Sequence, residues 1–395
     1  MSKNIFNRVK KEGLRIKHSY EKKDGPLVSC SICLQNDLID KEIYFDENGV
    51  CRYCLETKPQ YESLKGKQEQ LEDIIQEIKE DGVGRDYDCI IGMSGGVDSS
   101  YIAHLCKVYE LRPLVVHFDN GWNSELSIDN IYKIINQNQF DLETFVINWE
   151  EFKDLQRSFI KASVIDIEMV TDHAINATLA RLTKEHKIKY YLPGGNIATE
   201  SGMPTSWSWR KNDWINIKNI HKKFGKVKLK TFPTYSSFDL LLDKLLGAFS
   251  PKRIYILDHV DYKKNKAVDE LKDIYGWREY GGKHYESIFT KFYQGYILPQ
   301  KFNVDKRITH LSSLIRNDEM TLEEARGELN QELYSEDELT RDIEYFCNKL
   351  EFTREEFDQI MKERPVDHAY YKSDQKYYDL VSKLLYFLKS IGLRN

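Results

Sequence analysis

Short apolar runs alternate with amphipathic segments between residues 86 and 192. The runs have the length and composition of buried strands, and the apolar spacing between them is typical of helices. Strands are expected at 87–92, 114–118, 144–147 and 189–192, and helices at 99–109, 125–139 and 166–186. This alternation predicts an α/β fold, with a parallel sheet covered by helices on both faces. Such sheets bind ligands at the carboxyl ends of their strands, so the loops after the first, second and fourth strands are candidate sites.

Helical patterns flank this region on both sides. Apolar residues at helical spacing predict a helix over 60–80, and Thr321 and Thr353 each begin a capping-box pattern. A last amphipathic helix is expected at 374–392. The predicted units are an N-terminal segment at 1–59, a connecting helix at 60–84, the α/β domain at 85–300 and a helical C-terminal region at 301–395.

Four of the seven cysteines form two C-x2-C pairs near the N-terminus, Cys30 with Cys33 and Cys51 with Cys54. The 17 residues between Cys33 and Cys51 match the spacing of four-cysteine zinc sites. Four thiolates complete a tetrahedral structural site and leave no position open for catalysis. The pattern predicts a zinc ribbon within residues 1–59, with a hairpin between the two pairs. Four unrelated core cysteines and a redox pair are the alternatives.

The composition, with 41% hydrophobic and 31% charged residues, is that of a soluble globular protein. No apolar run approaches the ~18 residues of a membrane span, and the first residues, MSKNIFNRVKKEG, lack the apolar stretch of a secretory signal. We therefore expect a cytoplasmic protein with reduced thiols, in which Cys89, Cys106 and Cys347 are buried apolar side chains. The net charge of −5 argues against a nucleic-acid partner.

The loop after the first predicted strand is rich in glycine and serine and leads directly into a helix. It has neither the G-K-[ST] ending of a Walker A loop nor the G-x-G-x-x-G pattern. Two glycines let the backbone approach an anion, and the free N–H groups and positive dipole end of the following helix attract one. A pyrophosphate fits this cradle, and an ordinary Gly-Ser turn is the alternative. The loop consists of Ser94, Gly95, Gly96, Val97, Asp98, Ser99 and Ser100.

The string SGGVDSS resembles the pyrophosphate loop (PP-loop) of the N-type ATP pyrophosphatases, which include asparagine, GMP and NAD synthetases and tRNA-thiolating enzymes. The resemblance implies that a substrate oxygen attacks the α-phosphate of ATP, that pyrophosphate leaves, and that a nitrogen or sulfur nucleophile displaces AMP. It also implies Mg²⁺, held by Asp98 and Glu200. Further nucleotide contacts are implied at the ends of the second and fourth strands, from His117, Phe118, Asp119, Gly194, Gly195 and Asn196.

Several longer strings resemble the N-acetyl sugar amidotransferases of the WbpG and PseA type. They are CSICLQ, CRYC, IIGMSGGVDSSY, VVHFDNGWNSE, TDHAINA, LPGGNIATESGMP and GGKHYESIFTKFYQGYILPQKFNVDKRITHLSSLI, which span roughly residues 30–315. The resemblance implies conversion of an acetamido group on a nucleotide-activated sugar to an acetamidino group, in lipopolysaccharide or flagellar glycan biosynthesis. The amide oxygen would be adenylated, and ammonia would displace AMP.

Ammonia requires a source, and the second residue is Ser2 rather than the cysteine of an N-terminal-nucleophile glutaminase. The resemblance implies a separate glutaminase and an ammonia-delivering barrel, like the two chains of imidazole glycerol phosphate synthase. An anionic sugar nucleotide needs cations, so Lys283, Lys306 and Arg307 are candidate phosphate contacts and catalytic residues together with Asp98.

Some segments fit both a structural and a functional interpretation. Asp119-Asn120-Gly121 alone is a common turn, and Gly194-Gly195 alone is an ordinary loop. The tryptophans of 207–214 suit either base stacking or packing, and Asp172-His173 is more simply structural.

The main rival function is tRNA sulfurtransfer, because some of those enzymes also combine zinc cysteines with a pyrophosphate loop. The absence of a cysteine pair after the loop and the acidic net charge count against it.

Overall fold

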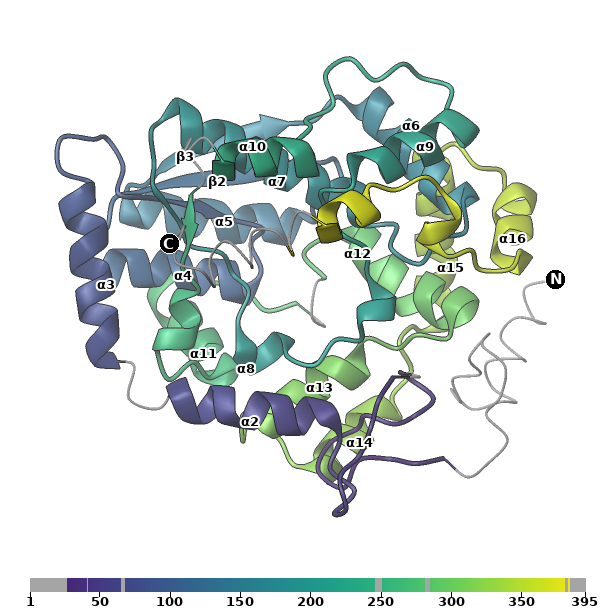
Figure 1. Cartoon of the computed structure of the whole chain (residues 1–395), viewed down its shortest axis with the longest axis horizontal. Helices are drawn as coiled ribbons and strands as arrows, with labels where there is room; N and C mark the ends of the chain where they lie inside the picture. The colour runs from purple at the N-terminus through teal and green to yellow at the C-terminus, as the bar shows by residue number, and fades with distance from the viewer. Residues whose placement is uncertain are drawn as a thin grey trace.

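Five strands form a parallel sheet in this computed structural model, which describes residues 27–40, 42–64, 68–245, 251–280, 285–380 and 383. The strand order is β3-β2-β1-β4-β5, and every neighbouring pair is parallel. The predicted parallel sheet is therefore confirmed (Figure 1). The strands are β1 (Cys89–Gly92), β2 (Pro113–Asp119), β3 (Asp141–Val146), β4 (Tyr190–Tyr191) and β5 (Lys252–Arg253).

Side chains alternate between the two faces of the sheet, as the period of a strand requires. Ile91 and Val115 pack in one apolar cluster with residues of α4 (Val97–Val108) and α5 (Glu125–Asn138). Their neighbours Ile90 and Val116 pack in another cluster with residues of α7 (Met169–Glu185). Helices thus cover both faces, and the near-continuous apolar runs of the central strands follow from this double burial.

The remaining helices are α2 (Arg52–Leu64), α3 (Gln68–Asp81), α6 (Trp149–Lys161), α8 (Ile197–Glu200), η1 (Thr205–Trp207), α9 (Trp214–Phe224), α10 (Ser237–Leu245), η2 (Ile256–His259), α11 (Lys264–Tyr275), α12 (Ile288–Phe292), η3 (Tyr293–Phe302), α13 (Arg307–Arg316), α14 (Leu322–Leu329), α15 (Glu336–Lys349), α16 (Arg354–Lys362) and η4 (His368–Tyr370). The single helix expected over 60–80 is wrong, because α2 and α3 divide that stretch. In the described part of the chain, no helix combines the length and apolarity that crossing a membrane requires.

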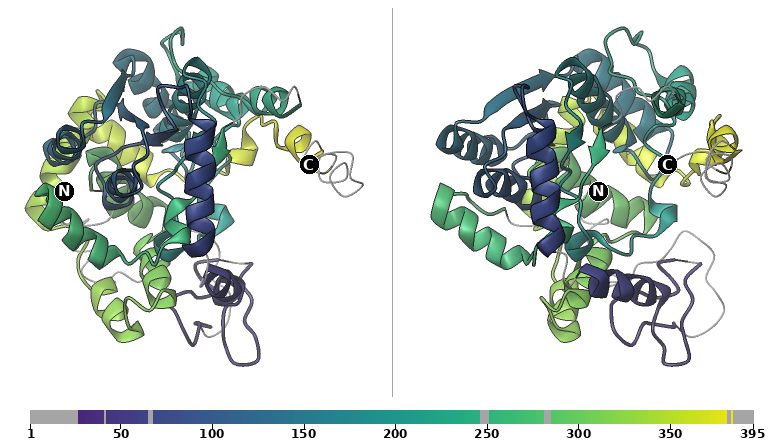
Figure 2. Two further views of the ribbon diagram at one scale, coloured as in Figure 1. Left: turned by 90° about the vertical axis from the view of Figure 1, so that its left-hand side faces the viewer. Right: turned by 60° about the vertical axis from the view of Figure 1, so that its left-hand side comes forward.

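The C-terminal helices pack against the α/β unit through one large aromatic core. Trp122, which follows β2, contacts Phe289 of α12 and Phe346 of α15, and Phe346 also contacts Phe357 of α16. Phe152 of α6 belongs to the same buried cluster. The two regions therefore share a core, and a site at the sheet edge can draw residues from both (Figures 1 and 2).

The helix starts expected in the C-terminal region are present. Thr321 forms both bonds of a capping box with Glu324 at the start of α14, and the Thr353 side chain accepts a bond from the Glu356 amide in α16. Residues 375–380 are helical, and the rest of the helix expected at 374–392 lies largely outside the described residues.

The N-terminal cysteine segment lies against α13 and the chain after α8. The Leu34 amide donates to Ser312 Oγ, and the Gln35 side chain donates to the Gly202 carbonyl. Figure 1 shows this purple segment beside α13, at the end of the molecule opposite β3. The segment is thereby joined to the chain that follows Glu200, the last residue of α8.

Candidate active site

A cavity of about 680 Å³ opens at the carboxyl ends of β1 and β2. Its walls come from the β1–α4 loop, the end of β2, one face of α7, α8, α12, η3 and the residue before α13. The structure thus brings the three predicted loops together in one site. The predicted residues that line it are Ser94, Gly96, Val97, Asp98, Ser99, His117, Phe118, Gly194, Glu200 and Lys306.

The β1–α4 loop presents backbone amides to the cavity. Gly96 is the N-cap of α4 and provides no side-chain cap, so the first amides of this helix face an anion site. Ser99 Oγ lies 3.2 Å from Ser94 Oγ and donates to the Gly96 carbonyl at 3.1 Å. The loop is therefore held by its own hydroxyl groups, in the strand–loop–helix setting expected from the sequence.

The backbone conformation of this loop requires a glycine at position 95. Its φ is +86°, and a Cβ at this position would lie 2.5 Å from the Ser127 carbonyl oxygen. Its own carbonyl accepts hydrogen bonds from Trp277 Nε1 at 3.2 Å and the Tyr280 hydroxyl at 2.8 Å. No side chain fits here without displacing the loop.

Replacing Gly95 with alanine is therefore expected to weaken binding of Mg–ATP, the ligand predicted from the sequence, by about 10-fold or more. Gly84→Ala is the matched control, because Gly84 also has a positive φ (+77°) but a Cβ added to it would meet no atom within 4 Å. Calorimetric titration of both variants measures the difference. Equal affinities for the two variants would contradict a close-packed loop.

Asp98 and Glu200 lie near two adjacent glycines, Gly194 and Gly195. A Cβ on Gly194 would lie 3.8 Å from Asp98 Cβ, and one on Gly195 would lie 3.6 Å from Glu200 Oε2. Asp98 also accepts a hydrogen bond from the Tyr262 hydroxyl, whose pKa is raised well above its usual value by burial. Carboxylate oxygens beside a phosphate cradle are the ligands that Mg²⁺ prefers, so this pair fits the expected ion.

The end of β2 is held by His117. Its Nδ1 lies 3.1 Å from the Met93 carbonyl, and its Nε2 lies 3.2 Å from Asn123 Nδ2. Asp119 does not line the cavity and instead accepts bonds from the Gly121 amide and Asn123. The turn interpretation thus applies to Asp119, whereas His117 and Phe118 border the cavity itself.

Four other predicted residues do not line the described cavity. Ser100 is buried in α4, Gly195 packs near Tyr255, and Asn196 caps α8 through the Thr199 amide. Arg307 pairs with Asp305 at 2.7 Å and donates to carbonyls at the end of α14 and just after it, away from the cavity lining. The two remaining candidates are Lys306, which lies 3.7 Å from Glu168, and Lys283, which falls outside the described residues.

The tryptophan segment is a packing cluster. Trp209 stacks on His368, and Trp214 stacks on His173 and Phe232. None of its three tryptophans is among the described cavity residues, so the structure favours packing over base stacking. His173 is buried and burial lowers its pKa to about 4, which agrees with the structural role expected for it.

Sequence reasoning missed three of the acidic residues that line the described cavity and favoured a structural role for a fourth, Asp172. Glu168, Glu279 and Glu286 line the cavity, as does Asp172, which pairs with Lys211 at 3.0 Å. Part of this acidic lining could have been found from the sequence, because the cavity residues of α7 and its N-cap recur at helical spacing. They are Glu168, Thr171, Asp172, Ile175, Thr178 and Leu179.

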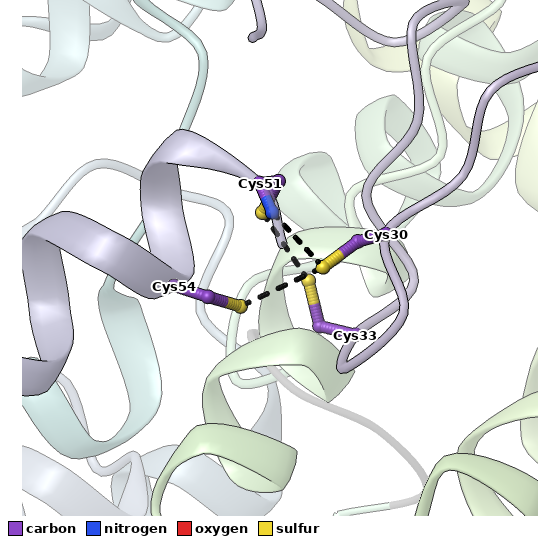
Figure 3. A group of neighbouring side chains, drawn as sticks. All are labelled: Cys30, Cys33, Cys51 and Cys54. Carbon is purple, nitrogen blue, oxygen red and sulfur yellow. Dashed lines mark hydrogen bonds between the residues drawn. The ribbon is translucent and has the colours of Figure 1, made fainter. Parts of the chain in front are cut away.

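The four cysteines of the two C-x2-C pairs meet in one buried cluster (Figure 3). All four sulfur atoms lie within 4.8 Å of one another, with Cys30 and Cys54 at 3.9 Å and Cys33 and Cys51 at 3.7 Å. A tetrahedral Zn²⁺ with bonds of about 2.3 Å places its sulfur ligands about 3.8 Å apart. The cluster therefore fits a mononuclear metal, and the four are not unrelated core cysteines.

Within the cluster, the hydrogen bonds favour a thiolate at Cys30. The pKa of Cys30 is lowered because hydrogen bonds from the thiols of Cys33, Cys51 and Cys54 stabilise its charged form. The backbone amides of Ile32 and Cys51 also donate to its sulfur. Cys89, Cys106 and Cys347 are buried elsewhere, as expected.

Residues 286–385 match the family model described as LPS biosynthesis protein WbpG-like, C-terminal domain. This stretch is similar to that C-terminal domain. The match confirms the resemblance noted from the sequence. The matched region contributes Glu286, Ser287, Thr290, Gln294 and Lys306 to the cavity, so the site is shared between this region and the parallel sheet.

No curated protein matches the chain. Solved structures similar to it include an NH3-dependent NAD synthetase from Campylobacter jejuni subsp. jejuni, at 16% identity over 53% of this chain and 92% of that one (TM-score 0.27). Another is NMN synthetase from Francisella tularensis, at 13% identity over 58% and 92% (TM-score 0.27). A third is the U34-tRNA thiolase NcsA from Methanococcus maripaludis with its [4Fe-4S] cluster, at 14% identity over 78% and 90% (TM-score 0.29).

Proposed function

We propose that this protein is an ATP-dependent amidotransferase, which converts an acetamido group of a nucleotide-activated sugar to an acetamidino group in lipopolysaccharide or flagellar glycan biosynthesis. The observation that carries the proposal is the shared cavity. One wall is the SGGVDSS loop at the start of α4, and another is the region that matches the WbpG-like family model. The proposed compartment is the cytoplasm, where ATP and sugar nucleotides are available.

The phosphates of ATP would lie against the uncapped amides of α4, with pyrophosphate as the leaving group. When bound there, Mg²⁺ would neutralise charge that develops on the phosphates. Asp98 and Glu200 are the residues proposed to hold it. The role of this chain in the step is to fix the α-phosphate in line with the attacking oxygen.

Adenylation is needed because a neutral amide is a poor electrophile. The amide oxygen attacks the α-phosphorus, the bond to pyrophosphate breaks, and the amide nitrogen loses its proton to give an O-adenylated imidate. Ammonia then adds to the imidate carbon, and the C–O bond breaks with AMP as the leaving group. One proton of the ammonia moves to the imidate nitrogen, so the product is a cationic amidine and no further proton is taken up.

The WbpG-like side of the cavity is the proposed binding region for the sugar nucleotide. Lys306 supplies a positive charge there, and Lys283 is proposed as a second phosphate contact. Glu168 accepts a hydrogen bond from Thr290 Oγ1 at 2.6 Å, which orients its carboxylate at the junction of the two regions. Ammonia is proposed to come from a glutaminase and barrel pair resembling imidazole glycerol phosphate synthase.

The test is an incubation with Mg–ATP, ammonium and a panel of UDP- and CMP-linked acetamido sugars. AMP and pyrophosphate are the expected nucleotide products, and the sugar should lose about 1 Da as oxygen is replaced by NH. Glutamine alone should give no product, since ammonia is proposed to come from a separate chain. Formation of ADP, or product with purified protein and glutamine, would contradict the proposal.

Sulfur transfer to tRNA is the rival function of the same class. It would require a persulfide-bearing cysteine or an iron–sulfur cluster near the nucleotide. Among the described residues, Cys89, Cys106 and Cys347 are buried and do not line the cavity. Binding of tRNA together with no amidine product would favour the rival.

A further inference from the structure

One part of the surface carries many lysines that have no acidic partner. Residues 214–232 contain no Asp, Glu or Arg. The lysines of this stretch, which we call the lysine patch, are all exposed: Lys218, Lys222, Lys223, Lys226, Lys228 and Lys230. None of them pairs with a carboxylate in the part of the chain that the structure describes, whereas Lys79, Lys252 and Lys272 elsewhere on the surface each do. Like charges so close together repel one another, so the patch produces a positive field that an anionic partner would neutralise.

Two buried carboxylates of α6 hold the backbone of the second half of the patch. Asp154 accepts hydrogen bonds from the Lys226 and Val227 amides, at 2.8 and 2.9 Å. Glu151 accepts one from the Thr231 amide at 3.0 Å. Between these two anchors, exposed lysines alternate with half-buried residues, as in an extended chain, so the lysines point outward together. The patch is therefore displayed by a fixed backbone, and its lysines outnumber the two buried carboxylates beneath it.

The first half of the patch lies on α9, which packs beside α6 (Figure 1). Ile215, Lys218 and Lys222 are spaced so that they share one face of this helix. Ile215 is 42% exposed, and Tyr370 of η4 is 71% exposed with its ring centre 5.2 Å from Lys223 Nζ. Outward apolar side chains are thus mixed with the lysines, and this combination is typical of surfaces that lie on membranes.

We propose that the lysine patch docks the protein on an anionic lipid bilayer. None of its lysines is among the described cavity residues, so neither ATP nor the sugar nucleotide would neutralise them. A protein partner usually anchors side chains in a pocket, whereas Ile215 and Tyr370 project outward, where a layer of lipid headgroups would receive them. A nucleic acid offers phosphates but no apolar layer. The inference is independent of the proposed reaction.

The test is cosedimentation of the full chain with phosphatidylcholine vesicles that contain either no phosphatidylglycerol or about one third of it. The wild-type protein should bind only the anionic vesicles, and added salt should release it, because screening weakens the attraction between exposed charges. Combining Lys226→Gln, Lys228→Gln and Lys230→Gln should weaken binding about 10-fold or more. The fold should be retained, since Asp154 and Glu151 bond to backbone amides that these substitutions keep.

Replacing Lys79, Lys252 and Lys272 together with glutamine is the matched control, because it changes the net charge equally at lysines that are already paired. This control should bind within about 2-fold of wild type. Ile215→Ser keeps every charge and should weaken vesicle binding about 3-fold or more, since it removes apolar surface. Wild-type protein that ignores the anionic vesicles would overturn the inference, as would wild-type affinity in either patch variant. Tighter binding of tRNA than of the vesicles at equal phosphate concentration would identify a nucleic-acid surface instead.

Discussion

Replacing Asp98 with asparagine is expected to lower ATP-dependent turnover by about 100- to 1000-fold. Asp98 lies in the first turn of α4, at the phosphate loop, and both Asp98 and Glu200 line the cavity. Asparagine keeps the side-chain volume and an oxygen that accepts from Tyr262, so the fold should be retained. The negative charge that would hold Mg²⁺ is lost. Release of AMP and pyrophosphate, measured across a magnesium titration, gives the effect.

Asp129→Asn is the control for this variant. Asp129 lies near the start of α5, forms exposed ion pairs with Lys133 and Arg278, and is not among the described cavity residues. It loses the same charge in a similar helical position and should remain active. If Asp98→Asn retained wild-type turnover at limiting magnesium, the assignment of Asp98 to the ion would be wrong.

Replacing Cys51 with serine is expected to remove the bound metal and to destabilise the whole chain. Metal binding contributes about 10–16 kcal/mol in small four-ligand zinc peptides, so the loss of one thiolate has a large effect. The effect should extend beyond the cysteine segment, since Leu34 and Gln35 bond to Ser312 and Gly202. Metal analysis and thermal unfolding of the purified variant measure both consequences.

Cys106→Ser is the matched control, because Cys106 is also fully buried but lies in α4 outside the cluster. It should keep its metal, with a smaller decrease in the unfolding temperature. One zinc per wild-type chain is the expected content. Iron in its place would refute zinc, and a well-folded, metal-free wild type would refute the metal site altogether.

The sequence predicted the features that depend on local spacing. The pyrophosphate loop, the central strands and the C-x2-C pairs each lie within a short stretch whose pattern limits the structure. The Thr321 capping box is also local, since Thr321 and Glu324 satisfy one another's backbone groups. In each of these cases, the residues that form the feature lie close together in the sequence.

The errors concern residues whose partners lie far away or in another element. Arg307 was expected at a phosphate, but Asp305 and the carbonyls at the end of α14 hold its guanidinium. Trp214 was ambiguous because only the fold brings Phe232 and His173 against it. Glu168 was missed because a carboxylate at the start of a helix is usually solvated, and only the position of α12 turns it toward the cavity.

The docking of the cysteine segment has a consequence for the order of folding during synthesis. Cys33 and Cys51 are 18 positions apart, whereas Leu34 and its partner Ser312 are 278 apart. At 5–20 residues per second, the ribosome needs roughly 15–60 s to make the chain between the last two. Metal can therefore close the N-terminal loop well before its docking surface on α13 exists. The cysteine segment would then fold before its docking surface is synthesised. The end of α8, which bears Glu200, would reach its final position only after α13 emerges from the ribosome.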